Sequence, residues 1–100
     1  MSLFRIVLLA CLSGAILSCG PVQYSHHVLR ANAAIAEAET AEAPEEAPYE
    51  YWYADAHLKQ ARREVGYSDF QEAVKCARIA NEYATKAVEI SNRRRRERGR

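Results

Sequence analysis

With 100 residues, the chain is long enough for one small domain and too short for two independently folded ones. Its 14 basic and 13 acidic side chains give a formal net charge of +1, but they are unevenly spread. The segment from Glu37 to Asp55 holds seven acidic residues and no basic one, and residues 93–100 hold six arginines. Such asymmetry concerns binding partners more than the fold.

The chain begins with a segment that has the features of an export signal. Arg5 precedes an apolar run of twelve residues, from Ile6 to Leu17. This run is shorter than the roughly 18–20 residues that a helix needs to cross a bilayer. We therefore interpret residues 1–18 as a secretion signal.

The end of this run, Ile16-Leu17-Ser18-Cys19, resembles the lipobox of bacterial lipoproteins, in which an aliphatic residue and a small residue precede a cysteine. The resemblance implies cleavage between Ser18 and Cys19, and attachment of a diacylglycerol and an N-acyl chain such as palmitate to Cys19. Gly20 stands where inner-membrane retention signals usually carry Asp. The implied location is thus the outer membrane of a Gram-negative bacterium, facing the periplasm. An ordinary cleaved signal and an uncleaved short membrane anchor are the alternatives.

Residues 19–27 contain a glycine and a proline and show no hydrophobic periodicity, which predicts a short tether. A first helix is expected from about Val28 to Glu42, where apolar residues recur at intervals of three and four. Pro44 should end it, because a proline inside a helix removes a hydrogen bond and clashes with the preceding turn.

A second helix is predicted from Pro48, which suits a first helical turn, to Gly66, which ends it. Its apolar stripe has the coiled-coil-like spacing 4, 3, 4, 3 and 4 and consists of Ala47, Tyr51, Ala54, Leu58, Ala61 and Val65. Ser68, followed three residues later by Gln71, has the form of a capping box and predicts the start of a third helix.

The third helix carries two adjacent apolar stripes, which implies two neighbouring helices. One stripe consists of Phe70, Ala73, Ala77, Ala80, Ala84 and Ala87, and the other of Cys76, Ile79, Tyr83 and Ile90. We predict an all-α domain in residues 28–92, in which a short helix packs on an antiparallel hairpin through alanine-rich interfaces. The third helix contains no Gly or Pro between Phe70 and Gly99, so it can continue into the arginine-rich tail (93–100) and approach 30 residues, or about 45 Å.

Two known families resemble parts of this pattern. The segment Gly66-Tyr67-Ser68-Asp69-Phe70, with alanines at 73, 77 and 80, is similar to half of a tetratricopeptide unit, but no 34-residue repeat accompanies it. Residues 16–91 resemble an uncharacterised family of small alanine-rich bacterial envelope lipoproteins, through the lipobox, the Ala-x-x-Ala-Ile-x-x-Ala segment and the Ala-Pro at 47–48. Longer relatives place such a domain before an OmpA-like peptidoglycan-binding domain, which is not expected within these 100 residues. The resemblance implies a location and a fold, not an activity.

Groups that could carry catalysis are sparse, so we expect no enzyme. His26 and His27 are adjacent and do not share a helical face, and His57 stands alone. A metal site of His26, His27, His57 and Cys76 is conceivable but lacks ligand spacing such as H-x-x-x-H, so no metal and no cofactor besides the lipid are expected. Cys76 is either a small buried hydrophobic residue or a thiol that forms an intermolecular disulfide or reacts.

A cluster of aromatic residues could bind a partner. The segment 49–53 holds four aromatics in five positions, which cannot all face one core. Tyr49, Trp52 and Tyr53 are therefore candidates for contact with a protein or a glycan. Packing against the first helix and anchoring at a membrane interface are the alternatives.

The arginine-rich tail is the second candidate. Its guanidinium groups, on Arg93, Arg94, Arg95, Arg96 and Arg98, match phosphates and carboxylates. Because export separates the protein from nucleic acid, the expected anions are lipid headgroups, lipopolysaccharide phosphates and peptidoglycan carboxylates. A solvated tail without a specific partner is the alternative.

These observations favour a non-enzymatic outer-membrane lipoprotein that acts as a structural or adaptor component of the cell envelope, in contact with another envelope protein or the wall. A periplasmic module that binds a small ligand or a metal is the alternative. Self-association through the alanine stripes is a third hypothesis.

Overall fold

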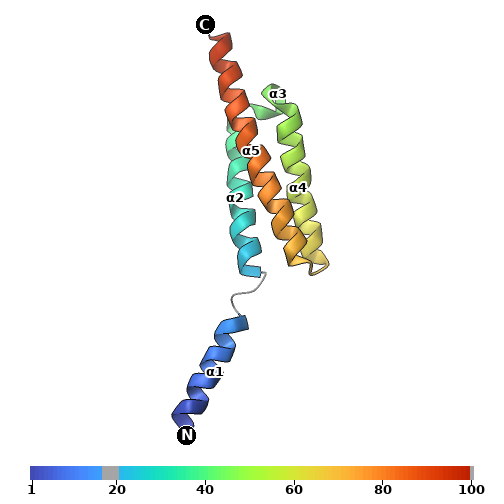
Figure 1. Ribbon diagram of the computed structural model, residues 1–100. Helices are drawn as coiled ribbons and strands as arrows, with labels where there is room; N and C mark the ends of the chain where they lie inside the picture. The colour runs from blue at the N-terminus through green and yellow to red at the C-terminus, as the bar shows by residue number, and fades with distance from the viewer. Residues whose placement is uncertain (17–20, 100) are drawn as a thin grey trace.

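The computed structural model describes residues 1–16 and 21–99, and these form helices and short connections without a strand (Figure 1). The helices are α1 (Ser2–Ile16), α2 (Pro21–Thr40), α3 (Ala43–Glu46), α4 (Pro48–Gly66) and α5 (Phe70–Arg98). The prediction of an all-α fold is confirmed for this described part of the chain.

Three long helices make the domain. Helix α5 shares its largest interfaces with α4 and α2, whereas α2 and α4 contact each other less. Figure 1 shows that α4 runs antiparallel to α5 and that α2 runs in the same direction as α5. The two stripes of α5 therefore have two neighbours, as predicted, and α4 and α5 form the expected hairpin.

The interior consists mainly of alanine. The principal buried cluster contains only three larger side chains, those of Ile35, Tyr51 and Leu58. The rest of it is alanine, at positions 31, 34, 38, 43, 47, 54, 80, 84 and 87. Small side chains allow close approach of the helices but remove little apolar area from water each, so a modest stability is expected for this length.

The first helix of the domain is longer than predicted. Residues 21–27, which we expected in a tether, form the first two turns of α2. Pro21 is tolerated there because N–H groups in the first helical turn have no intrahelical acceptor, so the N–H that proline lacks is not missed. Tyr24 then packs against a small buried cluster that contains Ala61 and Cys76. With Tyr24 and Val28 included, the inward stripe of α2 has a regular spacing, and the tether prediction is wrong for residues 21–27.

The proline-rich connection and both ends of α4 follow the prediction. Helix α2 ends at Thr40, before Pro44, and α4 spans Pro48–Gly66. Between them, Glu42 adopts a left-handed backbone conformation with φ 62°, and α3 forms a single turn. This turn reverses the chain so that α4 can run back along α2.

The predicted capping box at Ser68 is wrong. The residue that caps α5 is Asp69, whose side-chain oxygen accepts a hydrogen bond from the backbone N–H of Glu72 at 3.1 Å. Ser68 instead has φ 60° and belongs to the tight turn between α4 and α5. The cap lies one residue later because the turn needs one residue in the left-handed region, and Ser68 occupies that position.

Candidate functional site

The N-terminal helix α1 exposes most of its apolar side chains. Leu3, Phe4, Ile6 and Leu8 are each more than half exposed, and no other described helix contacts α1. Over the described ranges, no helix is both long and apolar enough to cross a membrane. The predicted lipidation residue, Cys19, lies outside the described residues.

The aromatic segment of α4 divides between the core and the surface. Tyr51 points inward, and its hydroxyl donates a hydrogen bond to Glu39 Oε1 of α2 at 2.8 Å. Burial, together with this bond and the negative charge of Glu39, raises the pKa of Tyr51 to about 12. Tyr51 thus links α4 to α2, and its three aromatic neighbours remain for other contacts.

Tyr53 is half-buried at the α4–α5 interface. Its ring centroid lies 4.3 Å from that of Tyr83 on α5 and 4.3 Å from that of His57. The ammonium of Lys86 lies 4.7 Å from the Tyr83 centroid, and His57 Nδ1 is 2.9 Å from the Tyr53 carbonyl oxygen. These contacts hold the Tyr53 ring in place beside Tyr49 and Trp52.

Tyr49 and Trp52 are exposed, by 65% and 55%. Together with Pro48, Tyr53 and Ala56 they line a shallow hollow at the start of α4. The structure therefore brings the three predicted aromatic candidates, Tyr49, Trp52 and Tyr53, together at one place on the surface. The lining contains no amide, carboxylate or guanidinium group, so the hollow offers an apolar contact.

The arginine-rich tail is helical up to Arg98 and is folded onto the acidic connection. Arg94 donates a hydrogen bond to the backbone carbonyl of Glu46, and Arg98 pairs with the carboxylate of the same residue. Arg95 Nε lies 3.8 Å from Glu42 Oε2. The side chain of Glu46 is only 11% exposed, so part of the tail belongs to the packed domain and not to a separate solvated segment.

Arg93 and Arg96 differ from these three arginines. Both are exposed, and neither forms an ion pair with another residue in the described part of the chain. Their helical positions place them on the side of α5 that faces away from the core. Of the five predicted tail residues within the described ranges, these two remain available to an outside anion.

The three histidines and Cys76 do not come together as one group, although His57 and Cys76 line the same hollow between α4 and α5. His26 and His27 make an edge-to-face contact with centroids 5.3 Å apart on α2, and His57 lies on α4. Within residues 1–16 and 21–99, no group of three or more His, Cys, Asp or Glu side chains is placed to hold a metal ion. Cys76 is buried, and burial followed by the nearby carboxylates of Glu72 and Glu64 raises the pKa of its thiol. A raised pKa leaves less reactive thiolate.

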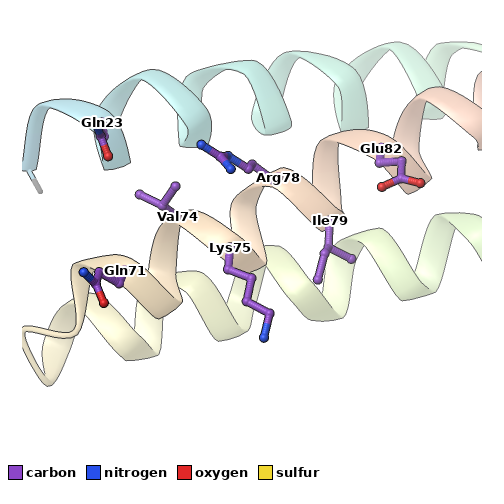
Figure 2. A pocket seen from close by; sticks show the side chains of 7 residues that line it. All are labelled: Gln23, Gln71, Val74, Lys75, Arg78, Ile79 and Glu82. Atoms are coloured by element: carbon purple, nitrogen blue, oxygen red, sulfur yellow. The ribbon is translucent and has the colours of Figure 1, made fainter.

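A further hollow between the start of α2 and α5 was not predicted from the sequence. Gln23 of α2 and Gln71, Val74, Lys75, Arg78, Ile79 and Glu82 of α5 line it. Figure 2 shows that Arg78 points toward α2, whereas Lys75 and Ile79 point to the other side of α5. The charged groups therefore diverge, and the hollow has no set of groups directed at one ligand.

Comparison with known proteins gives one finding. The family model described as a domain of unknown function, DUF4398, matches residues 28–100. No curated protein and no solved structure matches this chain. The matched range covers all of α3, α4 and α5 and most of α2, including the arginine-rich end of α5. The chain therefore belongs to the DUF4398 family of domains of unknown function.

Proposed function

We propose that this protein is a non-enzymatic outer-membrane lipoprotein of a Gram-negative bacterium, which acts as a structural or adaptor component of the cell envelope. The observation that carries the proposal is the sequence Ile16-Leu17-Ser18-Cys19 at the end of an apolar run. It supports lipidation of Cys19 after removal of residues 1–18.

The exposed apolar surface of α1 supports this proposal. Leu3, Phe4 and Ile6 have no protein surface to pack against among the described helices. Transfer of such side chains out of water is favourable by about 1.5–3 kcal/mol each. A segment of this kind suits the lipid environment in which an export signal is recognised before it is removed.

The proposed anchor is strong enough to hold the protein without help from the domain. Each acyl methylene buried in the bilayer contributes about 0.8 kcal/mol to the free energy of membrane binding, and a single acyl chain binds a membrane only reversibly. A diacylglycerol and an N-acyl chain on Cys19 would together make attachment effectively permanent. The helical domain is then free to contact another envelope protein, peptidoglycan, lipopolysaccharide or anionic lipid.

The surface of the domain supports a role in such contacts. Tyr49 and Trp52 are exposed beside an apolar hollow at the start of α4, and Arg93 and Arg96 are exposed near the C-terminal end of α5, at the same end of the hairpin (Figure 1). Exposed aromatic and arginine side chains are the residue types that contribute most to binding at protein interfaces.

The experiment that tests the proposal is intact mass analysis with membrane fractionation of the full chain, expressed in a Gram-negative host beside a Cys19→Ala variant. We expect a triacylated product that begins at Cys19 and sediments with the outer membrane, and a Cys19→Ala product that has no lipid and does not. A Cys11→Ala variant is the matched control and should be lipidated normally, since Cys11 lies within the proposed signal. An unlipidated wild-type product would contradict the proposal.

A further inference from the structure

One side of α4 is exposed along most of its length. Tyr49, Trp52, Ala56, Lys59 and Arg63 are all exposed and follow one another at spacings of 3, 4, 3 and 4. This spacing places them on one face of the helix, which we name the outer α4 face. The buried residues of α4 lie on the opposite side.

The outer α4 face has an aromatic half and a basic half. Tyr49, Trp52 and Ala56 line the apolar hollow at the start of the helix. Lys59 and Arg63 follow within two turns, so the face extends over about 21 Å from Tyr49 to Arg63. None of its five residues is acidic.

The two basic residues differ in their partners. Lys59 Nζ lies 2.8 Å from Asp55 Oδ2, which partly neutralises it. Arg63 donates hydrogen bonds to the uncharged Gln60 side chain, with Nε to Oε1 at 3.2 Å. The Arg63 guanidinium is thereby positioned at the surface, and within the described part of the chain it forms no ion pair with a carboxylate.

The basic half lies at the same end of the domain as the start of α2. Tyr24, in the first turns of α2, packs against Ala61 of α4, two residues before Arg63. Arg94 and Arg98, by contrast, bind Glu46 at the opposite end of α4. Arg63 is therefore near the end of the domain that an anchor at Cys19 would hold at a membrane.

We propose that the outer α4 face rests on an anionic lipid surface. Tryptophan and tyrosine side chains favour the boundary between lipid headgroups and acyl chains, and an arginine beside them matches a lipid phosphate. An apolar aromatic patch next to basic residues on one surface combines burial of apolar area with electrostatic attraction to anionic lipids, and the two contributions strengthen membrane binding together. A sugar ring is a poorer match, because a specific site for one needs several convergent polar groups beside the stacking ring, and the lining of the hollow offers no amide, carboxylate or guanidinium group.

This inference rests on the proposed function, since the partner surface is the membrane that would hold Cys19. It adds a second contact, made by the folded domain and directed by negative lipid charge. The domain then lies along the membrane on α4 and exposes the outward side of α5, with Arg93 and Arg96, to the periplasm.

The chain contains a single tryptophan, Trp52, which lies on the proposed face and reports on it directly. We would bind the purified full chain to vesicles of phosphatidylcholine with phosphatidylglycerol and to vesicles of phosphatidylcholine alone, and isolate the bound protein by flotation. The expected result is a blue shift of Trp52 emission and quenching by brominated lipid in the floated protein, both stronger with phosphatidylglycerol. Unchanged, water-exposed emission of floated protein would overturn the inference, as would failure to float with anionic vesicles.

Charge reversal tests the electrostatic part. In a Lys59→Glu/Arg63→Glu variant, the lipid concentration for a half-maximal Trp52 shift should rise about tenfold or more. A Lys75→Glu/Arg78→Glu variant is the matched control, since it makes the same charge change on an exposed part of α5 and should bind like the wild type. Equal losses in both variants would overturn the assignment to α4.

The outcomes separate this inference from the proposed anchor. Loss of Cys19 lipidation in cells, with an intact Trp52 shift on vesicles, would contradict only the anchor. Normal lipidation with water-exposed Trp52 would contradict only the role of the outer α4 face. A Trp52 shift with purified peptidoglycan and none with vesicles would overturn the inference in favour of the wall.

Discussion

The side chain of Arg94 donates a hydrogen bond to the backbone carbonyl of Glu46, a residue 48 positions earlier in the chain. This carbonyl ends the single-turn helix α3 and has no intrahelical partner, so the guanidinium supplies one. The contact joins the arginine-rich end of α5 to the acidic connection before α4. The two segments that make the charge distribution of the sequence so uneven therefore partly neutralise each other in the fold.

We expect Arg94→Ala to lower the free energy of unfolding by about 1 kcal/mol, because it removes a charged donor from a partly buried carbonyl. The measurement is urea unfolding followed by circular dichroism. Arg93→Ala removes an exposed arginine one position away and should change the stability by less than about 0.5 kcal/mol. Equal effects of the two substitutions would show that the contact with Glu46 does not stabilise the domain.

The hydrogen bond between Tyr51 and Glu39 predicts a loss of stability at high pH. The pKa of Tyr51 is raised to about 12 in the folded chain, against about 10 for a tyrosine in an unfolded chain. Its contribution to stability is thus complete below pH 10 and is lost as the pH rises from 10 to 12, where the unfolded chain releases the proton more readily. Absorbance titration near 295 nm should show one tyrosine that ionises last.

The matched variant for this effect is Tyr51→Phe, which keeps the ring in the core. It should lower the free energy of unfolding at pH 7 by about 1 kcal/mol and remove the tyrosine that ionises last. Tyr49→Phe, at an exposed ring, should do neither. Persistence of the late-ionising tyrosine in Tyr51→Phe would contradict the assignment.

Much of the fold follows from the sequence because alanine stripes of helical period occur in all three long helices. The prolines and Gly66 mark the ends of α4, and the two stripes of α5 indicate its two neighbours. The start of α2 was missed because a glycine and a proline suggested a tether, although Tyr24 continues the inward stripe by one more step. For locating the start of α2, the position of Tyr24 in the helical spacing was therefore a better indicator than the glycine and proline content of the segment.

The surface could be predicted only in part. The sequence shows that Tyr49, Tyr51, Trp52 and Tyr53 cannot share one side of a helix, but the register of α4 decides which of them enters the core. The division of the arginines between bound and outward residues could not be predicted, because it depends on how α3 places Glu46 against α5. Contacts between segments so distant in the chain produce no pattern of hydrophobic periodicity in the sequence.

The alanine interfaces predict a strong sensitivity to larger side chains. Ala80 is completely buried in the core cluster, so Ala80→Leu should lower the free energy of unfolding by about 1–3 kcal/mol or prevent folding. Ala33→Leu, on the exposed side of α2, should change it by less than about 0.5 kcal/mol. Thermal unfolding of both variants tests this, and tolerance of leucine at position 80 would show that the helices are not closely packed there.

The turn before α5 gives two neighbouring substitutions with different expected results. Asp69→Ala removes the side-chain acceptor of the Glu72 N–H and should cost about 1 kcal/mol of stability. Ser68→Gly should be neutral or stabilise by up to about 1 kcal/mol, because Ser68 has a backbone φ of 60° that glycine adopts without strain. If Ser68 were the cap, as its spacing from Gln71 suggests, Ser68→Ala would cost about 1 kcal/mol of stability and Asp69→Ala would cost less. Urea unfolding of the three variants decides which residue is the cap. A cap at Asp69 predicts that Asp69→Ala causes the largest loss of stability and that Ser68→Gly causes none.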